Sequence, residues 1–341
     1  MRMNLSKSVA ALIRQQKNFQ QAIVDFVDHG DGSYLDAPEI VPAAPMLSER
    51  AGFGSNPGSL RMLEYVPPGL KPGAPLVVVL HGCGQNADDF DRGSGWTTLA
   101  TQHGFALLYP EQSSSNNSHG CFNWFRPSSV ARDRGEVGSI RQMISAMVDD
   151  HDLDTDAVHV MGLSAGGALA TALLAAYPES FRAGAIVAGL PVGAARDAMN
   201  AFNVMTNGVV KTPDEWANLV QQAAPDSTSW PRISIWHGTQ DQVVNIKNAE
   251  ALREQWLAVH GLSDVAGKPA KFGQTSGHVW HDAKGNIKVE FTLIDGLDHG
   301  VPIKPGQGKA MPFMLASKMH LPQVLVDRWE LSTTVKKPRV L

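Results

Sequence analysis

One stretch near the middle of the chain constrains its fold most, because it changes from strand-forming to helix-forming residues around a serine. An apolar run from Ala157 to Met161 leads into Gly162-Leu163-Ser164-Ala165-Gly166, and a segment rich in alanine and leucine follows as far as Ala176. Strand, sharp turn and helix around G-x-S-x-G form the local context of a nucleophilic serine. The glycines allow the strand and the helix to approach closely. Because the pattern is short, a chance match is the alternative.

Apolar runs and helical patterns alternate along the rest of the chain. Apolar residues recur at helical spacing in residues 140–148 and 249–259. Continuous apolar runs are typical of strands that are buried on both faces. We expect strands at residues 60–66, 75–80, 105–109, 158–161, 185–187, 233–236 and 291–294. This alternation predicts an α/β fold in which helices cover both faces of a mostly parallel sheet.

Two stretches interrupt the alternation. Residues 190–231 contain few apolar runs and one helix-like piece at residues 213–224, which indicates an insertion of the kind that forms a lid or a pocket wall. Residues 264–290 contain the turn Lys284-Gly285-Asn286, and this turn predicts a small hairpin.

The two ends of the chain are less informative. Residues 1–28 form a weakly amphipathic pattern, and a helix is expected at residues 322–330. We divide the chain into an N-terminal helix and connector, residues 1–57, and a catalytic domain, residues 58–341. The apolar patch Val9 to Ile13 is shorter than the core of a secretion signal. A cytoplasmic location is therefore slightly favoured.

Composition and charge restrict the classes of partner. The net charge is −4, from 29 basic and 33 acidic residues, so the chain has no basic excess that would favour nucleic acid or an anionic membrane. A membrane-spanning helix needs roughly 20 consecutive apolar residues, and no run approaches that length. We expect neither nucleic acid nor a membrane as a partner, and the oligomeric state is left open.

Two later loops supply the partners that a nucleophilic serine needs. A serine hydroxyl is weak as a nucleophile unless a histidine removes its proton and an acid orients that histidine. Asp241 follows the expected strand 233–236, and His299 follows the expected strand 291–294. Ser164, Asp241 and His299 thus occur in the order serine, acid, histidine that hydrolases with a G-x-S-x-G turn use.

Other roles are open to the same residues. Asp241 can instead cap a turn or the helix that follows it, in which case Asp295 is the substitute acid. His299 can be a structural loop histidine, because the chain has twelve histidines. His81 and His237 each precede a glycine at a strand end, and we expect both to hold a turn.

Two backbone N–H groups are expected to stabilise a developing oxyanion. Ala165, directly after the serine, supplies one, and Cys83, in the loop after strand 75–80, supplies the other. The chain has two cysteines, Cys83 and Cys121, which are either reduced and separate or joined. A bond between them would stiffen the Cys83 loop. Trp124, with Phe122 and Phe125 beside it, is the candidate wall of an acyl pocket, and core packing is the alternative.

Five segments together resemble the polyhydroxybutyrate-depolymerase-like esterases, which belong to the α/β-hydrolase superfamily and are related to feruloyl and acetylxylan esterases. The segments are HGCGQ (81–85), CFNWF (121–125), GLSAGG (162–167), WHGTQDQVV (236–244) and GLDHGVP (296–302). The resemblance covers residues 60–305 and implies an α/β-hydrolase fold. It also implies a catalytic triad of Ser164, Asp241 and His299, the same residues that the strand order indicates. The family is often extracellular, which opposes the cytoplasmic expectation.

The resemblance implies a serine esterase whose substrate is a poly(3-hydroxybutyrate)-type polyester or its oligomers. Gly300-Val301-Pro302 after the histidine is similar to the depolymerase branch, whereas feruloyl esterases often carry a tryptophan there. The chain shows no linker and polymer-binding domain, so amorphous polymer, oligomers or small esters are expected rather than crystalline polymer. Neither a metal nor an organic cofactor is expected.

Three other functions compete with this one. The first is a feruloyl or acetylxylan esterase that acts on plant polysaccharide esters. The second is a serine peptidase of the same superfamily, which would usually carry an additional domain. The third is a non-enzymatic binding protein on a hydrolase scaffold, which would be expected to have lost a member of the triad.

Overall fold

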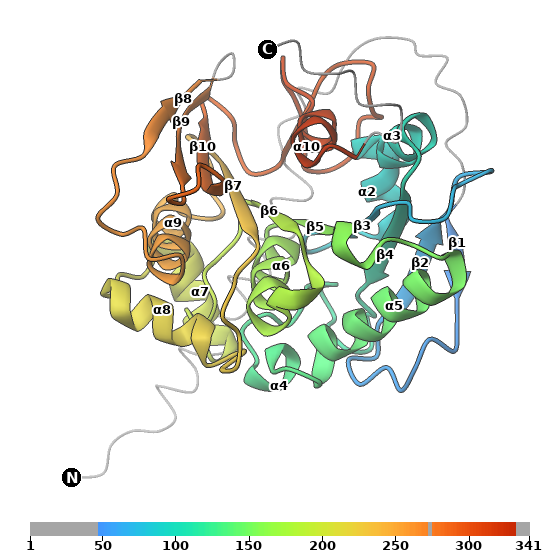
Figure 1. Cartoon of the computed structure of the whole chain (residues 1–341), viewed down its shortest axis with the longest axis horizontal. Helices are drawn as coiled ribbons and strands as arrows, with labels where there is room; N and C mark the ends of the chain where they lie inside the picture. Colours follow the sequence, from blue (N-terminus) through green and yellow to red (C-terminus); the bar gives the residue numbers. More distant parts are fainter. Residues whose placement is uncertain (1–46, 272–274, 332–341) are drawn as a thin grey trace.

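The computed structural model describes residues 47–271 and 275–331 (Figure 1). The helix predicted for residues 1–28 and the basic end of the chain lie outside the described residues. Within the described part of the chain, no helix combines the length and the apolar character needed to cross a membrane.

A twisted sheet of ten strands forms the centre of the molecule, in the order β1-β2-β4-β3-β5-β6-β7-β10-β9-β8. The strands from β4 to β10 in this order run parallel, and antiparallel strands flank them on both sides. Their bounds are β1 Ser48–Arg50, β2 Arg61–Tyr65, β3 Leu76–Leu80, β4 Ala106–Glu111, β5 Val158–Leu163, β6 Ala183–Val187, β7 Arg232–Gly238, β8 Lys268–Ala270, β9 Thr275–His281 and β10 Ile287–Ile294. The predicted mostly parallel sheet is confirmed.

Helices cover both faces of this sheet (Figure 1). The layer on one face consists of α5 Gly135–His151, α6 Ala165–Ala176 and α9 Lys247–Val259. The layer on the other face consists of α2 Ala87–Ser94, α3 Trp96–His103 and α10 Leu321–Trp329. The remaining elements are α4 Pro127–Val130, η1 Thr155–Ala157, η2 Pro178–Ser180, α7 Ala198–Asn207, α8 Pro213–Gln221, β11 Val301–Ile303 and β12 Met314–Ala316.

Alternation along the central strands sends side chains into two separate cores. Val78 and Leu80 of β3 belong to the core under α6, whereas Val77 and Val79 belong to the core under α10. Neither face of the strand meets solvent, which explains why the strand is an unbroken apolar run.

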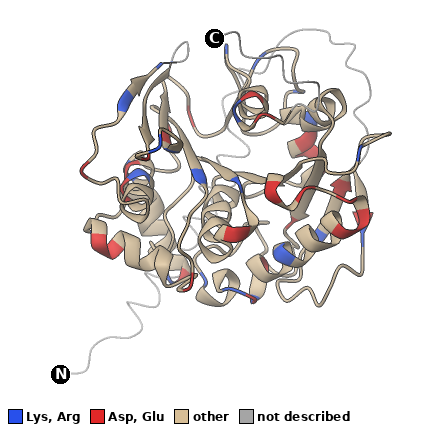
Figure 2. Ribbon diagram, in the orientation of Figure 1, with Lys and Arg blue, Asp and Glu red and all other residues tan. Residues whose placement is uncertain are grey.

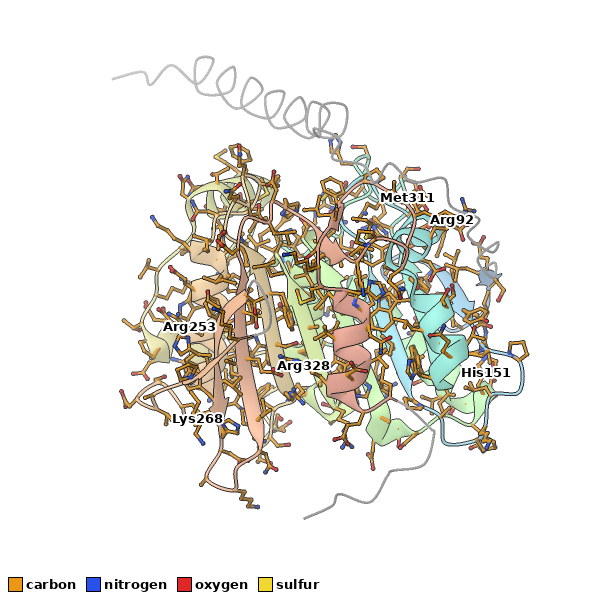
Figure 3. All side chains as sticks on the ribbon, turned by 90° about the horizontal axis from the view of Figure 1, so that it is seen from above. Arg92, His151, Arg253, Lys268, Met311 and Arg328 are labelled. Atoms are coloured by element: carbon orange, nitrogen blue, oxygen red, sulfur yellow. A yellow bond between two sulfur atoms is a disulfide. The ribbon has the colours of Figure 1, made fainter. Side chains whose placement is uncertain are left out.

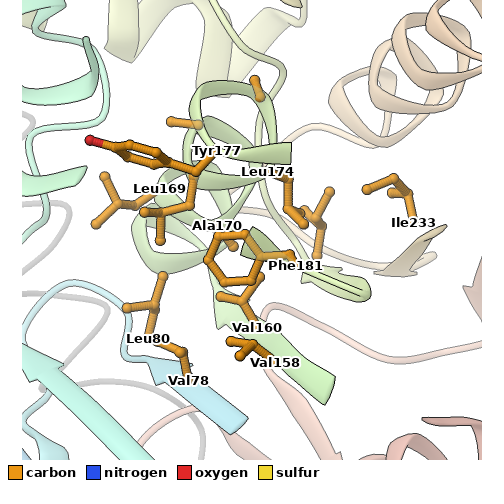
Figure 4. Close-up of a cluster of buried hydrophobic side chains, with 14 of the residues drawn as sticks. Val78, Leu80, Val158, Val160, Leu169, Ala170, Leu174, Tyr177, Phe181 and Ile233 are labelled. Atoms are coloured by element: carbon orange, nitrogen blue, oxygen red, sulfur yellow. The ribbon is translucent and has the colours of Figure 1, made fainter. Parts of the chain in front are cut away.

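Helix α6 packs directly on β3 and β5, as Figure 4 shows for Leu169 and Ala170 above Val78 and Val160. All residues of α6 are buried, so the helix is apolar around its whole circumference. It is the central helix of its layer and it begins directly after Ser164.

A cluster of charges fixes α10 over the opposite face of the sheet, where Figure 3 labels Arg328. The buried carboxylate of Glu290 on β10 accepts a hydrogen bond from Arg232 Nε of β7 at 2.9 Å and pairs with Arg328. The Arg328 guanidinium lies 5.2 Å from the centre of the Trp236 ring. Burial lowers the pKa of Arg328 to about 10.

Charged residues elsewhere are spread over the molecule. Figure 2 shows Lys and Arg interspersed with Asp and Glu over the helices of both layers.

The insertion and the hairpin are present, with one difference. The predicted hairpin is formed by β9 and β10, and its turn is closed by a hydrogen bond from Asp282 N to Asn286 O at 2.9 Å. The insertion contains α8, as expected, but it also contains α7, which was not expected. Helices α2 and α3 were not expected either, because α2 reads ADDFDRGS and presents a single large apolar residue, Phe90.

The turn between β5 and α6 depends on glycines that allow a close approach. A Cβ on Gly162 would collide with the backbone of Gly166 and Gly167, and a Cβ on Gly166 would collide with the carbonyl oxygens of Leu80 and His81. Backbone atoms cannot move aside as a flexible side chain can. The sequence therefore requires glycine at both positions for packing rather than for an unusual φ angle.

We expect Gly166→Ala to reduce the free energy of unfolding by about 3 kcal/mol, because the added methyl group overpacks a rigid site. Urea unfolding at pH 7 measures this change. Gly69→Ala is the matched control: Gly69 has a φ of 74° and open space around it, so it loses only about 1 kcal/mol from its backbone conformation. If Gly166→Ala were no less stable than Gly69→Ala, the packing argument would be wrong.

Candidate active site

Ser164 occupies the strained turn between β5 and α6. Its backbone has φ 57° and ψ −118°, a conformation that non-glycine residues rarely adopt. Two hydrogen bonds hold this backbone: Ser164 N donates to Val187 O at 2.9 Å, and Ala168 N donates to Ser164 O at 2.9 Å. Strain of this kind concentrates at functional sites, where the surrounding structure enforces it. The geometry is that of a nucleophile elbow.

Asp241 lies in the loop after β7, and its carboxylate is completely buried. Oδ1 accepts hydrogen bonds from the backbone N–H groups of Val243 at 2.9 Å and Val244 at 2.8 Å. Oδ2 lies 2.8 Å from Nδ1 of His299. One carboxylate oxygen therefore closes the turn at residues 241–244, and the other oxygen bonds to His299.

Electrostatics keep Asp241 ionised. Burial alone would raise the pKa of its carboxyl group, but the neighbouring His299 and His237 outweigh this effect, so the pKa of Asp241 is lowered from its ordinary value.

His237 contacts the Asp241 loop at two points. Its Nε2 lies 2.9 Å from Val244 O and 3.5 Å from Asp241 Oδ2. Burial lowers the pKa of His237, although the nearby Asp241 opposes this effect, and Nε2–H donates to the carbonyl oxygen of Val244. This contact confirms that His237 holds a turn.

His299 follows β10 and is 3% exposed. Its Nδ1 donates to Asp241 Oδ2, and in this tautomer Nε2 carries the lone pair that can accept a proton. Phe313 packs edge-on against the ring, with 5.9 Å between ring centroids. Asp295 is not the partner of His299: it is exposed, and its Oδ1 lies 3.5 Å from Thr239 Oγ1. The histidine thus pairs with the acid that was expected and not with its substitute.

The sheet brings these loops to one edge. Ser164, Asp241 and His299 follow the carboxyl ends of β5, β7 and β10, which run parallel with β6 between β5 and β7. Carboxyl ends of parallel strands are the usual place for a site in an open α/β sheet.

The loop after β3 lies against the first turn of α6, because Gly166 approaches the carbonyl oxygens of Leu80 and His81. Within this loop Gly82 N donates to Gln85 Oε1 at 2.9 Å, and Gly84 N donates to His119 O at 2.9 Å. Among residues 47–271 and 275–331, the backbone N–H groups of Cys83 and Ala165 have no hydrogen-bond acceptor. Both groups are therefore available as donors.

Two links stiffen this loop. Cys83 and Cys121 form a disulfide, as the hypothesis of a joined pair proposed. His81 Nδ1 donates to Gly82 O at 2.7 Å, and its Nε2 accepts from Gln112 N at 3.2 Å. Burial lowers the pKa of His81, so the ring remains neutral and can keep both contacts.

Glu136 connects residues next to these two links, and the sequence did not predict this role. Its buried carboxylate accepts hydrogen bonds from Asn123 N at 2.8 Å, Asn123 Nδ2 at 2.7 Å and Gln112 Nε2 at 2.8 Å. Burial raises the pKa of Glu136, and the bonds from Asn123 and Gln112 oppose that rise. A lone acid inside a helix carries no sequence signal of such a role.

Apolar side chains form a small separate cluster that includes Ala168, which lies in the first turns of α6 after Ser164. Trp124 packs on this cluster, and its ring meets Phe125 edge-on with centroids 5.7 Å apart. Phe122 is fully buried, and its ring lies tilted against that of His81, with centroids 4.7 Å apart. Phe122 therefore packs against the residue that begins the loop, whereas Trp124 packs on the apolar cluster. The other members of the cluster are Ala168, Leu190, Ala194, Ala195, Ala201, Val204, Met205, Val209, Val243 and Val244.

Several members of this cluster come from α7, the helix that the sequence did not predict. The insertion was expected to form a lid or a pocket wall, and its helix α7 contributes Ala201, Val204 and Met205 to this apolar cluster. Within the described ranges, no group of three or more His, Cys, Asp and Glu side chains is placed to hold a metal ion.

Comparison with known proteins identifies the family. The family model described as esterase PHB depolymerase matches residues 60–280. The chain belongs to this family.

Relatives within and around the esterase PHB depolymerase family carry the names of ester hydrolases. Poly(3-hydroxyalkanoate) depolymerase C of Paucimonas lemoignei is 40% identical over 263 residues, which are 77% of this chain and 63% of the relative. The chain thus spans less than two thirds of that depolymerase. An acetylxylan esterase of Coprinopsis cinerea is 32% identical over 283 residues, 81% of this chain and 74% of the relative. Feruloyl esterase B of Thermothelomyces thermophilus is 33% identical over 237 residues, 67% and 80% of the two chains.

A solved structure confirms the fold of this chain. The acetyl xylan esterase from Aspergillus awamori superposes with a TM-score of 0.72 at 23% identity, over 84% of this chain and 100% of that one. The predicted α/β-hydrolase fold is confirmed.

We expect Asp241→Asn to destabilise the protein at pH 7 and much less at low pH. A carboxyl group whose pKa is lowered on folding stabilises the fold above its unfolded pKa of about 3.9, and this contribution disappears as the pH falls through the folded value. Urea unfolding at pH 7, 5 and 3 should show the difference between wild type and variant shrinking below about pH 4. Asp295→Asn, which removes an exposed carboxylate, is the matched control. A difference that was constant with pH would contradict the ionised pair.

Proposed function

We propose that the protein is a serine esterase that cleaves carboxylic ester bonds through an acyl-enzyme. The observation that supports it most is the buried pair of Asp241 and His299, with 2.8 Å between Oδ2 and Nδ1, at the sheet edge where Ser164 occupies a strained turn. The named activities of the relatives belong to the same reaction class.

The proposed reaction has two halves. His299 takes the hydroxyl proton of Ser164 through Nε2 as the oxygen attacks the ester carbonyl carbon, and the imidazolium then protonates the departing alcohol. Asp241 holds the Nδ1–H tautomer and stabilises the imidazolium. Water, activated by the same histidine, attacks the acyl-enzyme and releases the acid.

Two backbone donors are proposed to stabilise the tetrahedral intermediates. Ala165 is the first residue of α6, so its N–H points out of the helix start, where the helix dipole also favours negative charge. Cys83 presents its N–H from the loop that packs against that turn, and the disulfide to Cys121 keeps this loop in place. Preorganised donors of this kind typically contribute about 3 kcal/mol each.

The substrate class that we propose is a poly(3-hydroxyalkanoate)-type polyester or its oligomers. The depolymerase relative is 40% identical, compared with 32% and 33% for the acetylxylan and feruloyl esterases. The apolar cluster around Trp124, Ala168 and Val244 suits a short aliphatic acyl group. A feruloyl or acetylxylan esterase is the second candidate, because those relatives cover a similar share of the chain.

We expect Ser164→Ala to reduce kcat on p-nitrophenyl butyrate at least about 10³-fold, since it removes the nucleophile. Asp241→Asn should lose about 10³- to 10⁴-fold, because it favours the wrong tautomer of His299. Asp295→Asn is the matched control and should keep wild-type activity. Comparable rates for wild type and Ser164→Ala would reject the assignment.

A second assay separates the substrate classes with the same enzyme preparation. Clearing of amorphous poly(3-hydroxybutyrate) and release of hydroxybutyrate oligomers support the polyester, whereas release of ferulate from methyl ferulate, or of acetate from acetylated xylan, supports the second candidate.

A further inference from the structure

Asp298, the residue before His299, connects the two loops of the proposed acid–histidine pair. One oxygen of its carboxylate, Oδ1, accepts the backbone N–H of His299 at 2.7 Å. The same oxygen accepts the backbone N–H of Gln242 at 3.1 Å. Gln242 directly follows Asp241, so a single oxygen atom is bonded to the neighbour of the acid and to the histidine itself.

Other contacts between these loops lie closer to the sheet. Thr239 N donates to Ile294 O at 3.0 Å, and Gln240 N donates to Leu297 O at 2.9 Å. Gly238 allows the close approach, since a Cβ there would collide with the carbonyl oxygen of Leu297. These bonds fix the loop stems, where the strands end. The Asp298 carboxylate acts farther out, at the residues that carry the side chains of the pair.

The need for such a link follows from the geometry of the pair. The 2.8 Å contact between Asp241 and His299 joins loops that leave different strands, β7 and β10. A displacement of about 1 Å at a catalytic group can cost on the order of 100-fold in rate. Asp241 is held on its other side by Val243 and Val244, and His237 braces that turn. Asp298 supplies the corresponding restraint to the backbone of His299.

We propose that Asp298 is a positioning residue of the esterase reaction. By accepting two backbone N–H bonds with one oxygen, it holds the His299 backbone in place relative to the Asp241 loop. This inference rests on the proposed function of Asp241 and His299. The role requires an acceptor oxygen at the end of a short side chain, and it does not require a negative charge.

Two variants of Asp298 distinguish a requirement for a hydrogen-bond acceptor from a requirement for a negative charge. Asp298→Asn keeps an acceptor oxygen of the same reach, whereas Asp298→Ala removes it. With p-nitrophenyl butyrate we expect Asp298→Ala to lower kcat about 10- to 100-fold with little change in KM, and Asp298→Asn to stay within about threefold of wild type. Asp295→Ala, in the same loop but exposed, is the control and should retain wild-type kcat.

A spectroscopic measurement tests the same point without catalysis. The Nδ1–H proton of His299 should give a low-field NMR signal that is absent in His299→Ala. We expect this signal in wild type and in Asp298→Asn, and its loss or broadening in Asp298→Ala. Urea midpoints for all variants show whether a loss is local or reflects global unfolding.

Three outcomes would overturn the proposal. The first is full kcat in Asp298→Ala with an unchanged NMR signal. The second is an equal loss in Asp298→Asn and Asp298→Ala, which would mean that charge rather than the acceptor geometry matters. The third is a proportional loss of stability and kcat in Asp298→Ala, which would indicate a merely structural role. An inactive wild type that retains the NMR signal would instead refute the esterase assignment and leave the positioning geometry intact.

Discussion

The close approach of α6 to β3 and β5 is the constraint on which the site depends. Gly162 and Gly166 remove the side-chain atoms that would keep the helix away from the backbone beneath it. The helix is buried along its whole length, and the turn before it holds Ser164 in a strained backbone conformation. The same approach brings the Cys83 loop against the helix start. One packing contact thus sets the serine and both proposed oxyanion donors.

The second half of the site depends on a buried ionic group that is fully satisfied. A carboxylate taken out of water is costly unless hydrogen bonds and opposite charge compensate it. Asp241 accepts two backbone N–H bonds and the Nδ1–H of His299, and Nε2 of His237 lies 3.5 Å from its Oδ2. The parallel strands β7 and β10 deliver these loops to one edge, and Asp298 joins them beyond the strand ends. The Asp241 carboxylate is therefore held in place and directed towards His299.

Much of this arrangement could be predicted from sequence because it depends on local patterns of residues. Strands buried on both faces are unbroken apolar runs, and glycines beside Ser164 mark the turn. Chain order then selected Asp241 and His299, and the structure pairs them. Helix α2 escaped prediction because it buries one aromatic residue among charged ones. Glu136 and Asp298 escaped because their partners lie far away in sequence or are backbone atoms, and neither leaves a pattern. The division of the chain at residue 57 stays a prediction.

The central claim, that Ser164 is a nucleophile activated by His299, is tested most directly by covalent labelling. The full-length protein is treated with a fluorophosphonate, and peptide mass spectrometry locates the adduct. One adduct on Ser164, absent in Ser164→Ala and formed far more slowly in His299→Ala, is the predicted result. Labelling at another residue, or equally fast labelling of Ser164 in His299→Ala, would contradict the claim.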